Sequence, residues 1–240
     1  MSRGRRNLWF SEKEGCEMLI AGRNGMMAKS SILPPGARWV EYLQSDGGQW
    51  IDTGVVPGGK IINAEVAFKQ LRLNGTVSGI IGSNVNDGQD NFQFTCHQSQ
   101  WRLKLNNYAS YNGLADTNTH ILKLNTDQGT FFDSRQLNTS QYTINTSNTR
   151  TVFLGACSYN GSPILSGDVY RLIGELYYAK IYDNGTLVRD FRPIAIGTTG
   201  YMLDLVTGEY LQYGNQGTGD FVIGPDISAP QLVGGGGVIS

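Results

Sequence analysis

The chain has 240 residues, and its 19 basic and 20 acidic side chains give a formal net charge of −1, so no sequence-wide field attracts nucleic acid or an anionic membrane. Charged residues make up only 16% of the chain, well below the roughly 25% of typical soluble domains, which predicts a largely neutral polar surface. No apolar run reaches the roughly 18 residues of a membrane-spanning helix, so we expect neither a nucleic-acid nor a membrane partner.

Residues 1–37 differ in composition from the rest and are predicted to form an N-terminal arm and hinge. Three arginines lie within the first six residues, and Pro34-Pro35-Gly36 stands near the end of the segment. The apolar run that follows the arginines is shorter than the roughly 7–15 residues of a signal-peptide core, so we expect synthesis in a host cytoplasm without a secretion signal. The arm residues that we expect a partner to bury are Leu8, Trp9, Phe10, Met18, Leu19 and Ile20.

Residues 38–226 are predicted to form one all-β domain with almost no helix, followed by a flexible Gly-rich tail at 227–240. Strands are expected at 61–68, 101–105, 121–124, 151–154 and 170–182. Asn-Gly pairs at 74–75, 112–113, 160–161 and 184–185, and an Asp-Gly pair at 87–88, tolerate the positive φ angles of tight hairpins. This spacing is typical of an antiparallel sandwich.

The clearest hairpin joins residues 176–182 to residues 186–191 through Asn184 and Gly185. Strict alternation in its first arm places Leu176, Tyr178, Lys180 and Tyr182 on one face, and Tyr177, Ala179 and Ile181 on the other. Gly174 is expected to mark a bulge or a join between two strands.

The three cysteines, Cys16, Cys96 and Cys157, are widely separated and form no Cys-x-x-Cys pair. A zinc site is therefore not expected. A Cys96–Cys157 disulfide would require two strands to meet, and two buried free thiols are the favoured interpretation.

The chain shows no pattern of catalytic residues, so we predict that it is not an enzyme. The glutamates do not alternate along a strand as Glu-x-Asp-x-x-Glu, the arrangement by which some sandwich folds hydrolyse glycans. His97 and His120 lie beside no Gly-x-Ser-x-Gly turn and are interpreted as surface or strand residues.

The run from Asn84 to Asn91 offers several oxygen ligands, but its spacing does not fit an EF-hand loop. An Asx-rich turn is favoured over a calcium site, and no cofactor is predicted.

Three blocks resemble one family. They run from Glu41 to Gly54, from Ala179 to Pro193, and from Gly200 to Tyr210 with Gly217 to Phe221. Together they are similar to concanavalin A-like and laminin-G-like jelly-roll domains encoded by phages and bacteria of gut communities. The resemblance implies two packed antiparallel sheets with a slight concavity, but no particular activity. Residues 70–165 match no block, and variable loops there would be the expected place for a binding surface.

A sugar site needs aromatic faces for the pyranose ring together with amide and carboxylate groups for its hydroxyls. This mixture occurs between residues 101 and 112, near an Asx-rich turn. An alternative is that the tryptophan belongs to the core and the tyrosines cap a sheet edge. The predicted ligand-binding residues are Trp101, Tyr108, Tyr111, Asn112, Asp87, Asp90 and Asn91.

Two functions follow from these features. The first is a structural protein of a phage particle, such as a capsid-associated decoration, head-fibre or tail component, in which the arm binds other virion proteins and the sandwich faces outward. In this hypothesis the protein is located in the virion and forms a homo-oligomer. The alternative is a free carbohydrate-binding module that recognises a host or bacterial surface glycan.

Overall fold

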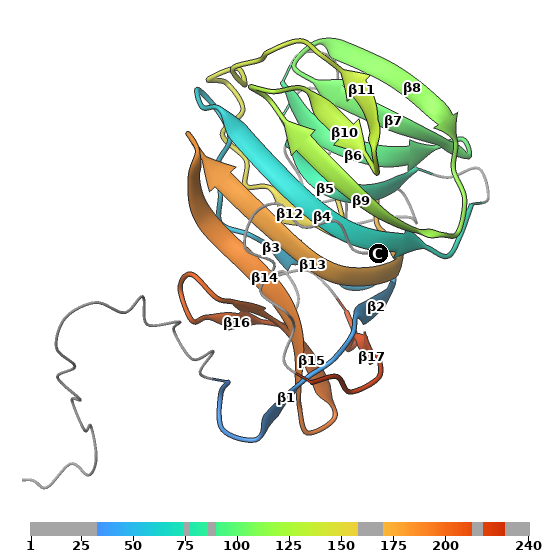
Figure 1. Ribbon diagram of the computed structural model, residues 1–240, viewed down its shortest axis with the longest axis vertical. Helices are drawn as coiled ribbons and strands as arrows, with labels where there is room; N and C mark the ends of the chain where they lie inside the picture. The colour runs from blue at the N-terminus through green and yellow to red at the C-terminus, as the bar shows by residue number, and fades with distance from the viewer. Residues whose placement is uncertain (1–32, 74–76, 86–89, 158–169, 213–217, 229–240) are drawn as a thin grey trace, which may run out of the picture. The chain divides into compact units, whose positions relative to one another are not determined.

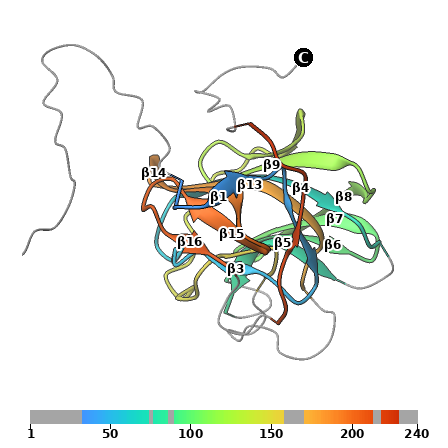
Figure 2. The ribbon, with the colours of Figure 1, turned by 90° about the horizontal axis from the view of Figure 1, so that it is seen from below.

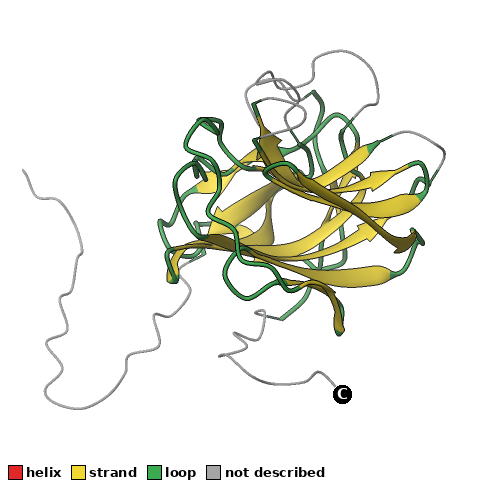
Figure 3. Cartoon of the chain, turned by 90° about the horizontal axis from the view of Figure 1, so that it is seen from above, coloured by secondary structure: helices red, strands yellow, loops and turns green. Residues whose placement is uncertain are grey.

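The sandwich is known from a computed structural model, which describes residues 33–73, 77–85, 90–157, 170–212 and 218–228 (Figure 1). The described residues belong to one unit that begins at Leu33. Within these ranges the chain forms strands and loops and no helix (Figure 3). In the part that is described, no helix is long and apolar enough to cross a membrane.

Two antiparallel sheets make up the fold. The large sheet has the order β11-β10-β9-β4-β13-β14-β15-β16, with β1 added on β14 and with β2 and β17 beside β13. Its strands are β1 (Ala37–Trp39), β2 (Leu43–Asp46), β4 (Ile62–Gln70), β9 (Thr119–Asn125), β10 (Thr130–Phe132), β11 (Arg135–Asn138), β13 (Ile173–Asp183), β14 (Thr186–Ile196), β15 (Thr199–Asp204), β16 (Tyr210–Leu211) and β17 (Val222–Ile223).

The small sheet has the order β3-β12-β5-β6-β7-β8 and lies behind the large sheet in Figure 1. Its strands are β3 (Ile51–Asp52), β12 (Phe153–Leu154), β5 (Ser78–Asn84), β6 (Asn91–His97), β7 (Gln100–Leu105) and β8 (Tyr108–Leu114). The prediction of an all-β, two-sheet antiparallel sandwich of the jelly-roll type is confirmed.

The core lies between the sheets, because alternate side chains of each strand point inward. Trp101 of β7 is 2% exposed and touches rings from both sheets. Its centroid lies 5.6 Å from that of Phe68 on β4 and 5.9 Å from that of Phe94 on β6. Trp101 is therefore a core residue, as the alternative interpretation of the sequence had it.

The β13–β14 hairpin forms as predicted, with φ of 48° at Asn184 and 81° at Gly185. The predicted division of faces along β13 is correct from Tyr178 to Tyr182 but wrong at Leu176, because the register against β4 shifts between Leu176 and Tyr178. Leu176, Ala179 and Ile181 all lie in the core as a result.

Gly174 does not mark this bulge. It lies within β13 and pairs with β4, and a Cβ atom there would stand 2.1 Å from the carbonyl oxygen of Lys69. The residue is a glycine because the neighbouring backbone approaches so closely.

Several predicted boundaries also change. β13 begins at Ile173, because Tyr170 has a φ of 69° that interrupts an extended strand. Only Phe153 and Leu154 of the expected strand at 151–154 pair in β12.

The Asn-Gly pair at 112–113 lies inside β8 and forms no hairpin. The other three predicted turns, at 74–75, 87–88 and 160–161, involve residues outside the described ranges.

Cys96 and Cys157 are both buried free thiols, which confirms the favoured interpretation of the sequence. Desolvation raises the pKa of Cys96 to about 11 and also raises the pKa of Cys157, so neither thiol is readily ionised. Cys16 lies outside the described residues.

At the N-terminal end of the described unit, Leu33 packs against an apolar cluster of Trp39, Ile194 and Leu203. β1 pairs with the last three residues of β14, as seen from below in Figure 2. The predicted partner-anchoring residues, Leu8, Trp9, Phe10, Met18, Leu19 and Ile20, lie outside the described ranges, as does the tail from residue 229.

We expect Trp101→Ala to lower the free energy of unfolding by about 3–5 kcal/mol, because it removes the ring that joins the two sheets. Tyr111→Ala on the neighbouring strand is the control. Tyr111 is 50% exposed, and its loss should cost less than about 1 kcal/mol. Urea unfolding of both variants measures the difference, and equal costs would contradict the assignment of Trp101 to the core.

Candidate functional site

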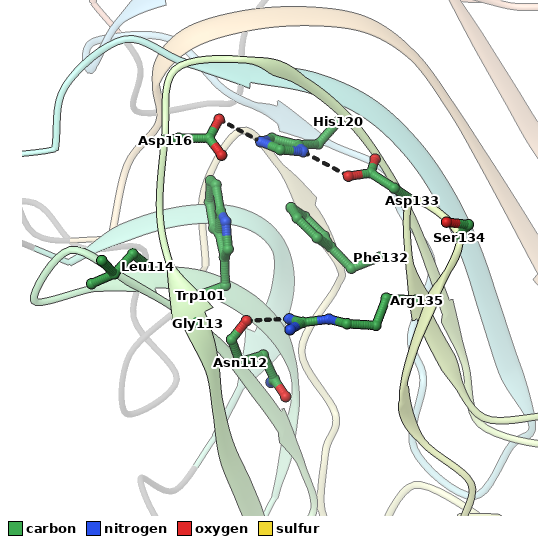
Figure 4. A pocket seen from close by; sticks show the side chains of 10 residues that line it. All are labelled: Trp101, Asn112, Gly113, Leu114, Asp116, His120, Phe132, Asp133, Ser134 and Arg135. Atoms are coloured by element: carbon green, nitrogen blue, oxygen red, sulfur yellow. Dashed lines mark hydrogen bonds and ion pairs between the residues drawn. The ribbon is translucent and has the colours of Figure 1, made fainter.

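A depression of about 400 Å³ opens at one edge of the sandwich, where β8 of the small sheet faces the β10–β11 hairpin of the large sheet (Figure 4). Its residues come from five strands, β7 to β11, and two connecting turns. The residues lining it are Trp101, Asn112, Gly113, Leu114, Asp116, His120, Phe132, Asp133, Ser134 and Arg135.

His120 occupies an inward-facing position of β9. It pairs in register with Phe68 of β4, and its side chain is 7% exposed. A buried imidazole requires hydrogen-bond partners. Two carboxylates supply them: Nε2 lies 2.9 Å from Asp116 Oδ1, and Nδ1 lies 2.9 Å from Asp133 Oδ2. We name this arrangement of Asp116, His120 and Asp133 the carboxylate clamp.

Backbone hydrogen bonds hold both carboxylates in place. Asp133 follows β10 with a φ of 53°, and its Oδ1 accepts the N–H of Ile121 at 2.9 Å. The N–H of Asp133 donates to the carbonyl of Ile121 at 2.7 Å, which connects the turn to β9. Asp116 Oδ1 accepts the N–H of Asn118 at 2.7 Å. The clamp therefore connects the β8–β9 loop to the β10–β11 turn through His120.

Asp116 of the clamp is held in its ionised form. Hydrogen bonds to a carboxylate favour its charged state, and Asp116 Oδ1 accepts the N–H of Asn118 and lies 2.9 Å from His120 Nε2. Burial alone would raise the pKa of Asp116, but the N–H of Asn118 and the His120 ring outweigh it and lower that pKa. Asp116 therefore stays ionised at neutral pH.

Aromatic rings form the floor of the depression. The His120 ring centroid lies 4.5 Å from that of Phe132 and 5.4 Å from that of Trp101. Phe132 is only 6% exposed, so the floor offers ring edges rather than open faces. Close packing against the core makes this floor rigid.

The rim is polar on one side and aliphatic on the other. Arg135 of β11 donates from Nη2 to the carbonyl of Asn112 on β8, so this contact joins the edges of the two sheets. Leu114 at the end of β8 is 77% exposed. The rim therefore presents a guanidinium, an amide and an aliphatic side chain around the clamp.

The predicted ligand-binding residues do not share one surface. Trp101 and Asn112 line the depression. Tyr111, the residue before Asn112 in β8, pairs with Arg102 on the outer face of the small sheet. The Arg102 guanidinium lies 5.4 Å from the centroid of the Tyr111 ring. Its hydroxyl lies 3.3 Å from His97 Nδ1.

Tyr108, Asp90 and Asn91 lie at the opposite end of β8. Tyr108 packs on Tyr142, with ring centroids 5.9 Å apart. Asn91 is fully buried and donates to the carbonyl of Asn106 at 2.7 Å. Asp90 accepts hydrogen bonds from Asn145 and Ser147 at 2.9 and 2.7 Å. Asp90 and Asn91 therefore tether loops, and Asp87 lies outside the described residues.

Eight of the ten lining residues were not predicted from the sequence, among them all four with ionisable side chains: Asp116, His120, Asp133 and Arg135. A signal was present for one of them. His120, Leu122 and Leu124 share the inward face of β9, so a histidine stands where alternation requires an apolar side chain. Such a position predicts a buried imidazole with polar partners, and Asp116 lies four residues before it.

The described residues contain no group of three or more His, Cys, Asp or Glu side chains placed to hold a metal ion. The two carboxylates of the clamp contact opposite nitrogens of the His120 ring, so they do not converge on one point.

We expect Asp116→Asn to reduce the loss of stability in acid. The pKa of Asp116 is lower in the folded protein than in the unfolded chain. The ionised side chain therefore stabilises the fold at any pH above the ordinary aspartate pKa, and this stabilisation disappears as the pH falls through the folded-state pKa. Between about pH 5 and pH 2, the melting temperature of the wild type should therefore fall more steeply than that of the variant. Glu209→Gln, an exposed change beside β16 at the far side of the large sheet, should follow the wild type. Parallel curves for all three proteins would contradict the clamp.

No protein-family model and no curated protein matches this chain. Among solved structures, it is similar to the carbohydrate-binding module of a Ruminococcus gnavus intramolecular trans-sialidase, with 13% identity, a TM-score of 0.43, and coverage of 61% of this chain and 90% of that one. A Streptococcus pneumoniae NanB sialidase mutant matches at 15% identity and TM-score 0.41, with 63% of this chain and 26% of that chain covered. A leech intramolecular trans-sialidase matches at 18% identity and TM-score 0.39, with 61% and 25% covered. Likeness at this level concerns the all-β fold and says nothing about a ligand.

Proposed function

We propose that this domain is a non-enzymatic glycan-binding module, with its sugar site in the depression between β8 and the β10–β11 hairpin. One observation carries the proposal. A single open depression of about 400 Å³ combines carboxylates, an amide and a guanidinium with an aromatic floor and an exposed leucine. Sugars require this mixture, because each ring has hydroxyls on its edge and apolar C–H groups on its faces.

The depression is rigid before any ligand arrives. The carboxylate clamp is hydrogen-bonded to backbone on both sides, and the Arg135–Asn112 contact joins the sheet edges. A binding site that is already ordered loses little conformational entropy when a ligand binds. This supports recognition of a small, weakly apolar ligand such as a sugar.

The geometry favours binding over hydrolysis. Glycosidases place the scissile bond between two carboxyl groups, one of which delivers a proton. In this depression the His120 ring occupies the space between Asp116 and Asp133, and both of its nitrogens are engaged. Neither carboxylate is positioned to act on a bond held between them.

Arg135→Gln and Asn112→Ala should each weaken glycan binding by about tenfold or more, since both side chains border the proposed sugar site. A glycan array with the intact chain finds the ligand, and calorimetric titration measures the variants. Tyr108→Ala, at the other end of β8, is the matched control and should bind as the wild type does.

Two results would count against this assignment. An array with no bound glycan, with or without calcium, would remove the proposed function. Loss of binding in Tyr108→Ala or Tyr111→Ala, with Arg135→Gln unaffected, would instead support the site predicted from the sequence.

A second proposal concerns where the module acts. The composition of residues 1–37 and the three sequence blocks that resemble phage-encoded domains support display on a phage particle, with the arm binding other virion proteins. Display and glycan binding are compatible, because an outward-facing lectin-like domain would serve attachment to a host surface.

Deletion of residues 1–32 should leave the melting temperature nearly unchanged and abolish incorporation into particles. The deletion stops before Leu33, because that side chain packs on Trp39, Ile194 and Leu203. Mass spectrometry of purified particles from the source detects incorporation. A protein found only in the soluble lysate would refute the virion role, and a fall of more than about 4 °C in melting temperature would show that the arm stabilises the sandwich.

A further inference from the structure

The charges around the depression indicate which sugars it accepts. We propose that the site selects neutral sugars and discriminates against acidic ones. This inference rests on the proposed glycan-binding function and specifies the ligand class of the same site.

Two carboxylates dominate the surface that a ligand would meet. The side chains of Asp116 and Asp133 are 48% and 49% exposed, and they stand on two sides of the depression. His120 between them has a side-chain exposure of only 7%. The carboxylates therefore face the ligand, whereas the imidazole that they contact is buried beneath them.

The His120 ring cannot bind an anionic ligand directly. Its two nitrogens each lie 2.9 Å from a carboxylate oxygen of Asp133 or Asp116, so neither nitrogen remains for a third partner. Moving the ring toward a ligand would break both contacts and leave a buried polar group without partners, which is costly.

Arg135 is the cation among the lining residues. Its Nη2 already donates to the carbonyl of Asn112, and the residue is exposed. One guanidinium does not outweigh the two carboxylates of the same depression. An ion pair between this exposed guanidinium and an acidic sugar would also contribute little binding free energy. An acidic sugar would gain one favourable contact and meet two like charges.

The same carboxylates suit neutral hydroxyl groups. Asp116 uses Oδ1 both for its contact with His120 and for the bond from the N–H of Asn118, so Oδ2 is the oxygen that we expect a ligand to meet. Figure 4 shows this second oxygen turned toward Trp101 at the floor. A sugar hydroxyl that donates to it would form a charge-assisted bond, which is stronger than a bond between neutral groups.

The size of the depression limits how much of a glycan is recognised. Its volume of about 400 Å³ lies near the lower end of typical ligand sites. One sugar ring at the end of a chain fits this space better than an extended oligosaccharide does. The charge of that single ring therefore decides whether the glycan binds.

The test compares matched glycans on the intact chain, by array and then by calorimetry. Lactose and 3′-sialyllactose form one pair, and other neutral glycans with their sialylated counterparts form the rest. We expect the neutral members to bind and the acidic members to bind about tenfold more weakly or not at all, because a carboxylate within about 4 Å of a like charge is repelled. Salt should have little effect on the neutral ligands.

Asp133→Asn provides a second readout. It removes one of the two repelling charges while keeping a side chain of the same size, so the preference for neutral over acidic members should shrink. Near-UV circular dichroism checks that the variant keeps the wild-type packing. The inference would be overturned if the acidic glycans bound as tightly as their neutral counterparts, or if Asp133→Asn kept the full preference for the neutral glycans. Either result would leave glycan binding itself intact. Absence of binding to either class would instead refute the proposed function itself.

Discussion

The contact of the Trp101 ring with Phe68 and Phe94 is the interaction on which the rest of the sandwich depends. It holds β7 of the small sheet against β4, a central strand of the large sheet. The same ring lies 5.4 Å from His120, so the core continues directly into the floor of the depression. Stability and the candidate site therefore share one aromatic layer, and changes to it alter both.

Burial of a histidine in that layer has consequences at the surface. The imidazole requires a partner at each nitrogen, and the partners are Asp116 and Asp133, which lie at the ends of two separate loops. Meeting this requirement brings two carboxylates to the rim and orders the loops that carry them. The two half-exposed carboxylates at the rim are the basis for proposing a neutral sugar as the ligand.

Much of the fold was predictable because it depends on local signals. Asn184 and Gly185 adopt positive φ, and β4, β7 and β9 follow the expected alternation. The errors arose where a distant strand decided the outcome. The bulge between Leu176 and Tyr178 places Leu176 on the same buried face as Ala179 and Ile181, against the prediction, and it is defined by the register against β4. Gly174 is explained by the approach of Lys69, which lies far away in the sequence.

The sequence by itself determined the all-β class, the antiparallel hairpins and the presence of an aromatic and amide-rich segment at 101–112. Periodicity and turn chemistry act over a few residues, so they can be recognised without coordinates. Only the tertiary structure decided that Trp101 belongs to the core, that Tyr108 and Asn112 lie at opposite ends of β8, and that Asp133 meets His120. These facts depend on which strands and sheet edges come together. The pairing of β4 with the distant β13, and the contact of β11 with β8 across the two sheets, are long-range information that no local pattern contains.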